Sequence, residues 1–133
     1  MIKKDSKKSE KKIILVVDDE PNILELEKAI LEVENYNVIT AQSGQEALDL
    51  LKKIKPDLIL LDMMMPNMSG REVCERIRKD PKTKKLKVIF VTVARFSELG
   101  KDQLKGMNVS DYITKPFENS DFINRIKKVL DEK

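Results

Sequence analysis

The sequence contains no histidine and only one cysteine, Cys74. The absence of histidine excludes a metal site with imidazole ligands and a catalytic triad built on histidine. A single cysteine cannot form a disulfide within the chain. Neither of the glycine-rich patterns of nucleotide-binding loops, G-x-x-x-x-G-K-S/T and G-x-G-x-x-G, occurs. Any metal would therefore have to be bound through oxygen atoms.

Long hydrophobic runs are also missing. The longest apolar stretches have about the length of a strand, so no segment is expected to cross a bilayer. Residues 1–12 are charged and lack the apolar region of a secretory signal. With 41% hydrophobic and 37% charged residues, the 133-residue chain is expected to form one soluble domain in the cytoplasm, without a membrane partner.

The positive charge is confined to the start of the chain. The formal net charge is +3, but residues 1–12 hold six lysines against Asp5 and Glu10, which leaves the remainder at −1. No aromatic side chains alternate with these lysines, and no folded basic surface is expected beside them. We therefore expect residues 1–11 to form a flexible basic tail and residues 12–131 to form the domain, with no direct nucleic-acid binding.

Five short apolar stretches alternate with five helical patterns. The expected strands cover residues 13–17, 38–41, 58–61, 88–91 and 112–114. Four helices are expected to bury the following apolar sets: Ile23, Leu26, Ile30 and Val33; Ala47, Leu48, Leu51 and Ile54; Val73 and Ile77; Phe122, Ile126 and Val129. A weaker pattern at 96–104 is expected to be the fourth of the five helices. The alternation predicts a three-layer α/β/α sandwich with a five-stranded parallel sheet.

Local signals predict the ends of these helices. Pro21 suits the first turn of a helix, and Ser43 with Glu46 has the pattern of a capping box. Asp80, which precedes a proline, is expected to end the third helix. The lysine-rich segment 82–87 is expected to be a solvated loop.

Polar side chains stand at the ends of four expected strands. They are Asp18 with Asp19, Asp62, Thr92 and Lys115. Because the carboxyl ends of parallel strands meet at one edge of a sheet, these side chains are expected to lie together. Two charges about 4 Å apart repel by roughly 4 kcal/mol at an effective dielectric constant of 20, so three carboxylates require a cation. Oxygen ligands suit Mg²⁺, and a carboxylate can also act as a nucleophile toward phosphorus.

Each of these residues also has an ordinary explanation. An aspartate after a strand often caps a helix or opens a turn. A lysine before a proline is often simply exposed, and Tyr112 fits a hydrophobic core. The convergence of all of them at one edge favours a chemical site.

Four motifs resemble those of a known family. VVDDE at 16–20, LLDMMMPNMSG at 60–70, VT at 91–92 and DYITKPF at 111–117 resemble, in the same order, the motifs of receiver domains of two-component response regulators. The resemblance covers about residues 12–130. It implies a flavodoxin-like fold with strand order 2-1-3-4-5.

The resemblance also implies the chemistry of the strand ends. Asp62 would accept a phosphoryl group from a histidine kinase or a phosphotransfer protein. Mg²⁺ would be bound by Asp62 and Asp19 directly, by Asp18 mainly through water, and by the backbone carbonyl of Met64. Lys115 would contact the phosphoryl oxygens, and its bond to the following proline is predicted to be cis.

Thr92 and Tyr112 would form the switch that responds to the phosphoryl group. By the same resemblance, the switch changes the face made by the fourth helix, the fifth strand and the fifth helix. That face would bind an output partner or a second copy of the chain. The chain would be a regulatory phosphoacceptor and not an enzyme. It ends soon after the expected fifth helix, so no output domain is expected within it.

The sequence departs from the family pattern near Thr92. Val93 stands where a small residue is usual, and residues 107–109 (MNV) replace a common Ala-Gly-Ala. Met64 and Ala94 resemble positions where polar side chains can orient the attacking water. Because neither side chain makes a strong hydrogen bond, a long-lived aspartyl phosphate is predicted.

Two other functions fit the sequence less well. A docking module that uses the fold without phosphorylation would have no need of Asp19, Asp62 and Lys115 together. An aspartyl-phosphate hydrolase would resemble the pattern Asp-x-Asp, whereas Met64 stands at the third position here.

Overall fold

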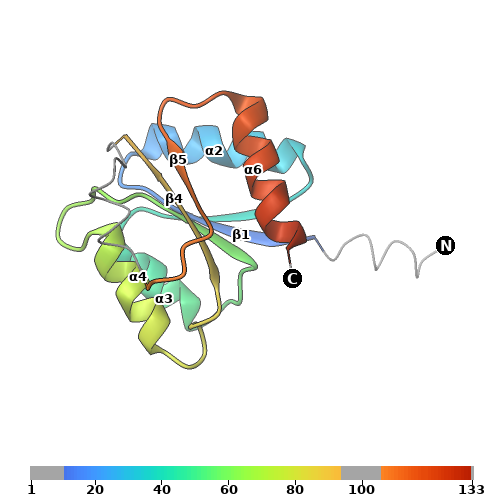
Figure 1. Cartoon of the computed structure of the whole chain (residues 1–133). Coiled ribbons are helices and arrows are strands. Elements are labelled where there is room, and N and C mark those ends of the chain that lie inside the picture. Colours follow the sequence, from blue (N-terminus) through green and yellow to red (C-terminus); the bar gives the residue numbers. More distant parts are fainter. Residues whose placement is uncertain (1–10, 94–105, 133) are drawn as a thin grey trace.

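The computed structural model describes residues 11–93 and 106–132, and its centre is a parallel sheet (Figure 1). The strands lie in the predicted order β2-β1-β3-β4-β5. Their bounds are β1 Ile13–Val17, β2 Asn37–Ala41, β3 Leu58–Leu61, β4 Lys87–Thr92 and β5 Asp111–Thr114. In the register of the sheet, Val17 at the end of β1 is opposite both Ala41 and Leu61. Strands β1, β2 and β3 therefore end at the same level.

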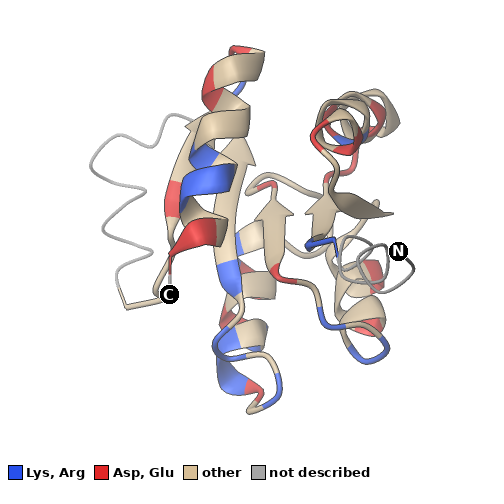
Figure 2. Cartoon of the chain, turned by 90° about the vertical axis from the view of Figure 1, so that its right-hand side faces the viewer, with Lys and Arg blue, Asp and Glu red and all other residues tan. Residues whose placement is uncertain are grey.

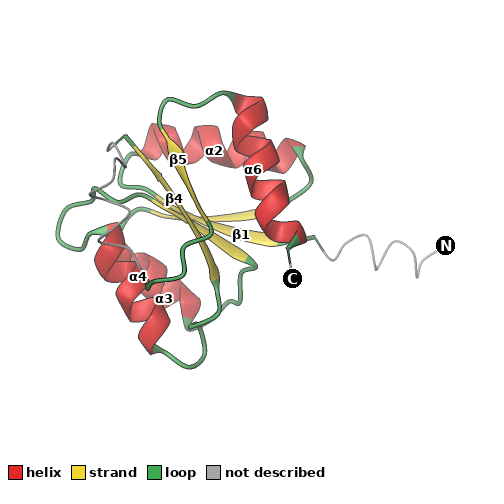
Figure 3. Ribbon diagram, in the orientation of Figure 1, coloured by secondary structure: helices red, strands yellow, loops and turns green. Residues whose placement is uncertain are grey.

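Four helices of the described residues cover the two faces of the sheet (Figure 3). They are α2 Pro21–Val33, α3 Gly44–Leu51, α4 Gly70–Lys79 and α6 Asn119–Asp131. Helices α2 and α6 share one hydrophobic cluster with the sheet, and α3 and α4 share the other, which confirms the three-layer α/β/α sandwich. None of these helices is long and apolar enough to cross a membrane. The helix expected at 96–104 lies outside the described residues, as does the expected tail apart from Lys11.

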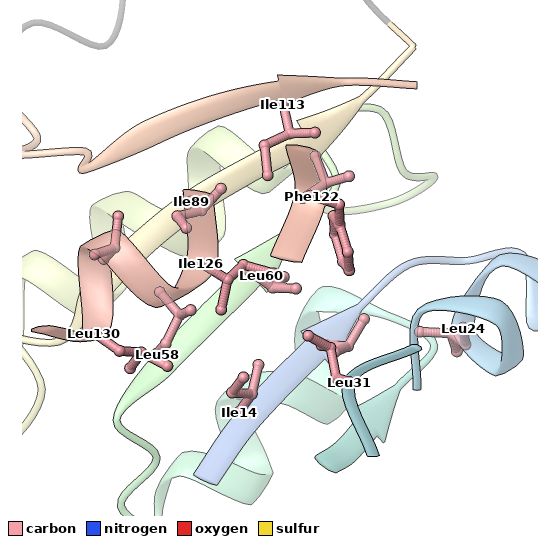
Figure 4. Packing of buried hydrophobic residues seen from close by; sticks show 13 residues of the cluster. Ile14, Leu24, Leu31, Leu58, Leu60, Ile89, Ile113, Phe122, Ile126 and Leu130 are labelled. Atoms are coloured by element: carbon pink, nitrogen blue, oxygen red, sulfur yellow. The ribbon is translucent and has the colours of Figure 1, made fainter. Parts of the chain in front are cut away.

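The side chains of the strands alternate between these two cores. On β1, Ile14 and Val16 belong to the core beneath α2 and α6, whereas Leu15 and Val17 belong to the core beneath α3 and α4. Figure 4 shows the first core, in which side chains from the sheet pack against those of α2 and α6. Strand β3 is buried at every position, which explains its unbroken aliphatic sequence.

The predicted face of helix α2 is confirmed only in part: Ile30 packs against the core, but the fully buried positions lie one residue from the predicted ones. Leu24, Glu27 and Leu31 are buried, whereas Leu26 and Val33 are 48% and 82% exposed. Both faces have helical spacing, but the predicted one is wholly apolar and the observed one carries a glutamate at its middle. Apolar periodicity alone therefore places the buried face of this helix about one residue away from where it lies.

Helices α3 and α4, which lie on the other face of the sheet from α2, differ in the hydrogen bonds that cap their first turns. At α4, the Ser69 hydroxyl accepts a hydrogen bond from the backbone N–H of Glu72 at 3.2 Å. The Glu72 carboxylate accepts one in return from the N–H of Ser69 at 3.1 Å, which completes a capping box. At α3, the Ser43 hydroxyl caps the helix as predicted. The second half of the predicted box is wrong, because the Glu46 carboxylate accepts from the N–H of Gln42 instead.

The amino edge of the sheet carries a cleft lined by lysines. It has a volume of about 690 Å³ and lies between residues 51–56 and 81–86. Its lysines are Lys52, Lys53, Lys55, Lys82, Lys84 and Lys85; Figure 2 shows the basic loops at this edge. Lys87 departs from the predicted solvated loop, since it begins β4 and its ammonium donates to the carbonyls of Val129 and Glu132 at the end of α6.

Candidate functional site

Asp18 and Asp62 lie one residue beyond the ends of the adjacent strands β1 and β3. The backbone N–H of Asp62 donates to the carbonyl of Val17 at 3.0 Å, and that of Asp18 donates to the carbonyl of Ala41 at 3.1 Å. These bonds continue the parallel ladder past the aliphatic strands. Asp18 is 2% exposed and Asp62 is 6% exposed. Two ionisable side chains are thus buried at the carboxyl edge of the sheet.

Asp19 completes an acidic cluster with this pair. One carboxylate oxygen from each of Asp18, Asp19 and Asp62 lies within 4.8 Å of the others. Three anions at this spacing repel one another, whereas a divalent cation such as Mg²⁺ prefers oxygen ligands of this kind. The spacing and the chemistry of the donor atoms therefore fit Mg²⁺.

Lys115 brings a positive charge to the cluster from the end of β5. Its Nζ lies 2.6 Å from Asp18 Oδ2 and 3.8 Å from Asp62 Oδ2. The backbone N–H of Lys115 donates to the carbonyl of Thr92 at 2.9 Å, and the bond to the following proline is cis, as predicted. Burial lowers the pKa of Lys115, but the hydrogen bond to Asp18 and the charges of Asp62, Asp18 and Glu27 raise it above its ordinary value. The lysine is therefore charged at neutral pH.

The carboxylate of Asp62 is oriented by two further hydrogen bonds. Its Oδ1 accepts one from the backbone N–H of Met64 at 3.2 Å, and the Thr92 hydroxyl donates another. The pKa of Asp62 is raised above its ordinary value because burial outweighs the other effects. Lys115 and the two hydrogen bonds lower this pKa, while Asp18 raises it. A buried aspartate with a raised pKa and a lysine partner is typical of a reactive site.

Gly70 packs directly against the backbone of Asp62. A Cβ atom at position 70 would lie 2.2 Å from the carbonyl oxygen of Asp62 and 2.9 Å from Met63 Cα. Backbone atoms cannot move aside as a flexible side chain can, so only glycine fits here. The N–H of Gly70 also donates to the Met63 carbonyl at 2.9 Å. The motif at 60–70 contains this glycine, but the pattern alone does not reveal that it supports the aspartate.

The expected switch residues, Thr92 and Tyr112, lie on the neighbouring strands β4 and β5. Thr92 is fully buried, and Tyr112 is half-buried. The ring of Tyr112 stacks on Phe90, with ring centroids 6.3 Å apart and an interplanar angle of 11°. Positions 90 and 92 of β4 point to the same side of the sheet, so the threonine and the stacked rings share one core. The role of the two residues as a switch stays a prediction.

A fourth acidic residue, Glu27, acts on this cluster from helix α2. It is 1% exposed, and its Oε2 has no hydrogen-bond partner among the described residues. The pKa of Glu27 is raised to about 8, mainly by burial; the charges of Asp18 and Asp62 also raise it, and that of Lys115 lowers it. Glu27 is therefore largely protonated at neutral pH. Its spacing of three and four residues from Leu24 and Leu31 fits this position, but the sequence does not show that this face of α2 packs inward.

The family model of the response regulator receiver domain matches residues 14–127. The match covers most of the chain and includes the acidic cluster, Thr92 and Lys115, so the chain belongs to the response regulator receiver domain family. Receiver domains are regulatory phosphoacceptor domains of two-component systems, and they interact with histidine kinases or phosphotransfer proteins. The resemblance found in the sequence is thus confirmed.

Individual relatives agree with this assignment. The chain is 40% identical over 119 residues to the phosphate regulon transcriptional regulatory protein PhoB of Pseudomonas aeruginosa, covering 90% of this chain and 52% of that protein. It spans about half the length of the curated relatives that it matches.

Two solved structures show the same fold. The chemotaxis protein CheY4 of Vibrio cholerae has a TM-score of 0.84 and 28% identity, covering 90% of this chain and 98% of that one. The response regulator TrrA of Thermotoga maritima, solved in complex with Mg(2+)-BeF, has a TM-score of 0.77 and 40% identity. The match covers 89% of this chain and 98% of that one.

Proposed function

We propose that the chain is a phosphorylation-dependent signalling switch in which Asp62 accepts a phosphoryl group. The observation that carries the proposal is the position of the Asp62 carboxylate, within 4.8 Å of oxygens from Asp18 and Asp19 and 3.8 Å from the Lys115 ammonium. A histidine kinase or a phosphotransfer protein would be the donor. The donor histidine would have to lie outside this sequence, which contains none. The switch would act in the cytoplasm.

The proposed reaction is a displacement at phosphorus. A carboxylate oxygen of Asp62 forms a bond to phosphorus while the bond between phosphorus and the donor atom breaks, and the donor leaves with the bonding electrons. Asp18, Asp19, Asp62 and the backbone carbonyl of Met64 would hold Mg²⁺, which supplies positive charge to the phosphoryl oxygens. The complex of TrrA with Mg(2+)-BeF supports the binding of Mg²⁺ by this chain.

Lys115 and Thr92 would stabilise the phosphorylated form. The Lys115 ammonium already lies beside Asp62 Oδ2 and would pair with a phosphoryl oxygen. The Thr92 hydroxyl, which donates to the Asp62 carboxylate, would move toward the phosphoryl group, whose charge makes the stronger acceptor. The space left by this movement would let Tyr112 turn inward.

The output of the switch would be a change in the face made by β5, α6 and the helix that the sequence predicts at 96–104. Within the described residues, the guanidinium of Arg125 on α6 donates to both carboxylate oxygens of Asp111 at the start of β5, at 3.0 Å. The strand that carries Tyr112 is thus tied to α6, so a movement of the tyrosine would affect both elements. An output partner or a second copy of the chain would bind this face.

Labelling with acetyl phosphate tests the proposal. The wild type and Asp49→Asn, which alters an exposed aspartate on α3, should gain one phosphoryl group when Mg²⁺ is present and none when it is removed. Asp62→Asn should gain none, and unchanged labelling of this variant would refute the assignment of the acceptor. A folded wild type that is not labelled would favour the docking module instead. The exposed Met64 side chain, at the position where a hydrolase would carry its second acid, gives the hydrolase no support.

A further inference from the structure

Glu27 is buried between two leucines on the inner face of α2. Leu24 and Leu31 belong to the core that joins α2, α6 and the sheet (Figure 4). The Oε2 atom of Glu27 is buried without a hydrogen-bond partner in residues 11–93 and 106–132. An ionised carboxylate in such surroundings is strongly unfavourable, so the group binds a proton instead. The receiver chemistry proposed above makes no use of this residue.

The charges that act on Glu27 come from the proposed phosphorylation site. They are Asp18 after β1, Lys115 after β5 and Asp62 after β3. The side chains that α6 buries in the same core are all apolar, as are those that the strands contribute to it. Glu27 itself lies about two helical turns into α2, and its Oε2 makes no hydrogen bond to the three aspartates. The site therefore influences it through space.

We propose that Glu27 is a fourth acidic group of the site, which holds a proton when no divalent cation is bound and releases it when the cation binds to Asp18, Asp19 and Asp62. This inference rests on the proposed function, because the cation position is part of it. Only the O–H bond of the carboxyl group breaks, the proton passes to the buffer, and nothing is oxidised or reduced. Glu27 is thus a positioning residue that sets the charge of the site and does not touch the reacting atoms.

The sign of the effect follows from the charges of the cluster. Three aspartates and Lys115 have a net negative charge, which disfavours ionisation of Glu27. A divalent cation removes this excess and so favours loss of the proton. Because linkage is reciprocal, the cation should bind more tightly as the pH rises through the region where Glu27 loses its proton.

The composition of the chain allows the release of a proton by Glu27 to be measured. Without histidine, few groups of this chain change charge between pH 7 and 9. Burial raises the pKa of the Cys74 thiol above its ordinary value, which moves it toward the upper end of this range or beyond. The terminal amino group ordinarily titrates near pH 8, but it is present in every variant and cancels in a comparison.

Calorimetric titration of the full chain with MgCl₂ tests the inference. Measurements at one pH in buffers of different ionisation enthalpy give the number of protons released, and a series from pH 7 to 9 gives the change in affinity. The variants are Glu27→Gln and Glu27→Leu, with Glu25→Gln as the control, because Glu25 is exposed on the same helix. The wild type and the control should release up to about one proton and gain up to about tenfold in affinity per pH unit. The two Glu27 variants should bind Mg²⁺ without releasing this proton and without that gain.

Each outcome distinguishes this inference from the proposed function. Equal proton release by the wild type and both Glu27 variants overturns the role of Glu27, as does a wild type that binds Mg²⁺ and releases no proton. A wild type that binds no Mg²⁺ at any pH overturns the proposed metal site, and the inference with it. If the variants do not fold, the ¹³C signal of the Glu27 carboxyl group in the wild type decides. If the chemical shift of this signal has its titration midpoint near pH 8, and the midpoint moves to lower pH when Mg²⁺ is added, the role is supported. A midpoint near the ordinary pKa of a glutamate refutes it.

Discussion

Lys115 and Asp18 form the shortest salt bridge of the described residues, with Nζ 2.6 Å from Oδ2. Their side chains are only 10% and 3% exposed, so the attraction is screened much less than that of a surface pair. The lysine lies farther from Asp62, at 3.8 Å. The charge of Asp62 is thus only partly balanced by Lys115, and we expect a cation to balance the rest.

Lys115→Ala should destabilise the protein when divalent cations are removed. The variant leaves the buried Asp18 and Asp62 carboxylates without their cationic partner, and the loss of one member of a buried pair costs about 3 kcal/mol. Urea unfolding in EDTA measures this loss, with Lys128→Ala on the exposed side of α6 as the control. Because Mg²⁺ can supply the missing charge, it should stabilise the variant more than the wild type. A variant as stable as the control in EDTA would show that Lys115 does not balance the cluster.

Glu27→Gln should become more stable relative to the wild type as the pH rises. The pKa of Glu27 is about 8 in the folded protein against 4.5 for an ordinary glutamate. A raised folded-state pKa gives stability that is fully present below pH 4.5 and is lost as the pH rises toward 8, by at most about 1.4 kcal/mol per unit. The difference between variant and wild type should therefore grow by on the order of 3 kcal/mol between pH 5 and 8.

Urea unfolding at several pH values measures this difference. Glu25→Gln, at an exposed position of the same helix, is the control. A difference between Glu27→Gln and the wild type that does not change with pH would mean that Glu27 is ionised in the folded protein at neutral pH.

The position of the acidic cluster follows from the alternation of strands and helices, because parallel strands with helical crossovers bring their carboxyl ends to one edge, whereas the strand order is implied by the resemblance of the four motifs. Aliphatic runs of strand length, each ended by a polar residue, are enough to predict that Asp18, Asp62 and Lys115 meet. The burial of Glu27 and the contact of Gly70 could not be predicted in this way. They depend on which side of a helix packs inward and on how closely two backbone segments approach, and neither is encoded by apolar periodicity.

Gly70→Ala should impair the site more than it impairs α4. The added methyl group would overlap the Asp62 carbonyl, so the loop after β3 must shift, at a cost of about 1–3 kcal/mol. Urea unfolding measures this cost, and labelling by acetyl phosphate should slow because the acceptor moves with its backbone. Arg71→Ala, at the exposed next position, should change the unfolding free energy by less than about 0.5 kcal/mol. Wild-type labelling in Gly70→Ala would show that the contact does not position Asp62.

Met64→Asn should shorten the lifetime of the aspartyl phosphate. The Met64 side chain is 62% exposed next to Asp62, and its thioether is at best a weak acceptor for the attacking water. If orienting the water contributes about 1.4 kcal/mol, the amide should speed hydrolysis roughly tenfold. Loss of the phosphoryl group after removal of the donor measures the rate, and Met64→Leu should behave as the wild type. Ala94, the second position predicted to affect the lifetime, lies outside the described residues.

The lysine-lined cleft lies before β3 and β4 and the acidic cluster lies after β1 and β3, so these two groups of opposite charge set up a field along the strands. A charged macromolecule that diffuses toward it is turned by this field before any contact forms. The field therefore changes the rate at which the macromolecule and the domain meet in a productive orientation. It weakens with added salt, since the screening length decreases from about 10 Å at 0.1 M to about 3 Å at 1 M. Replacing lysines around the cleft is therefore expected to change how fast a charged partner reaches Asp62, although these lysines lie at the far end of the molecule.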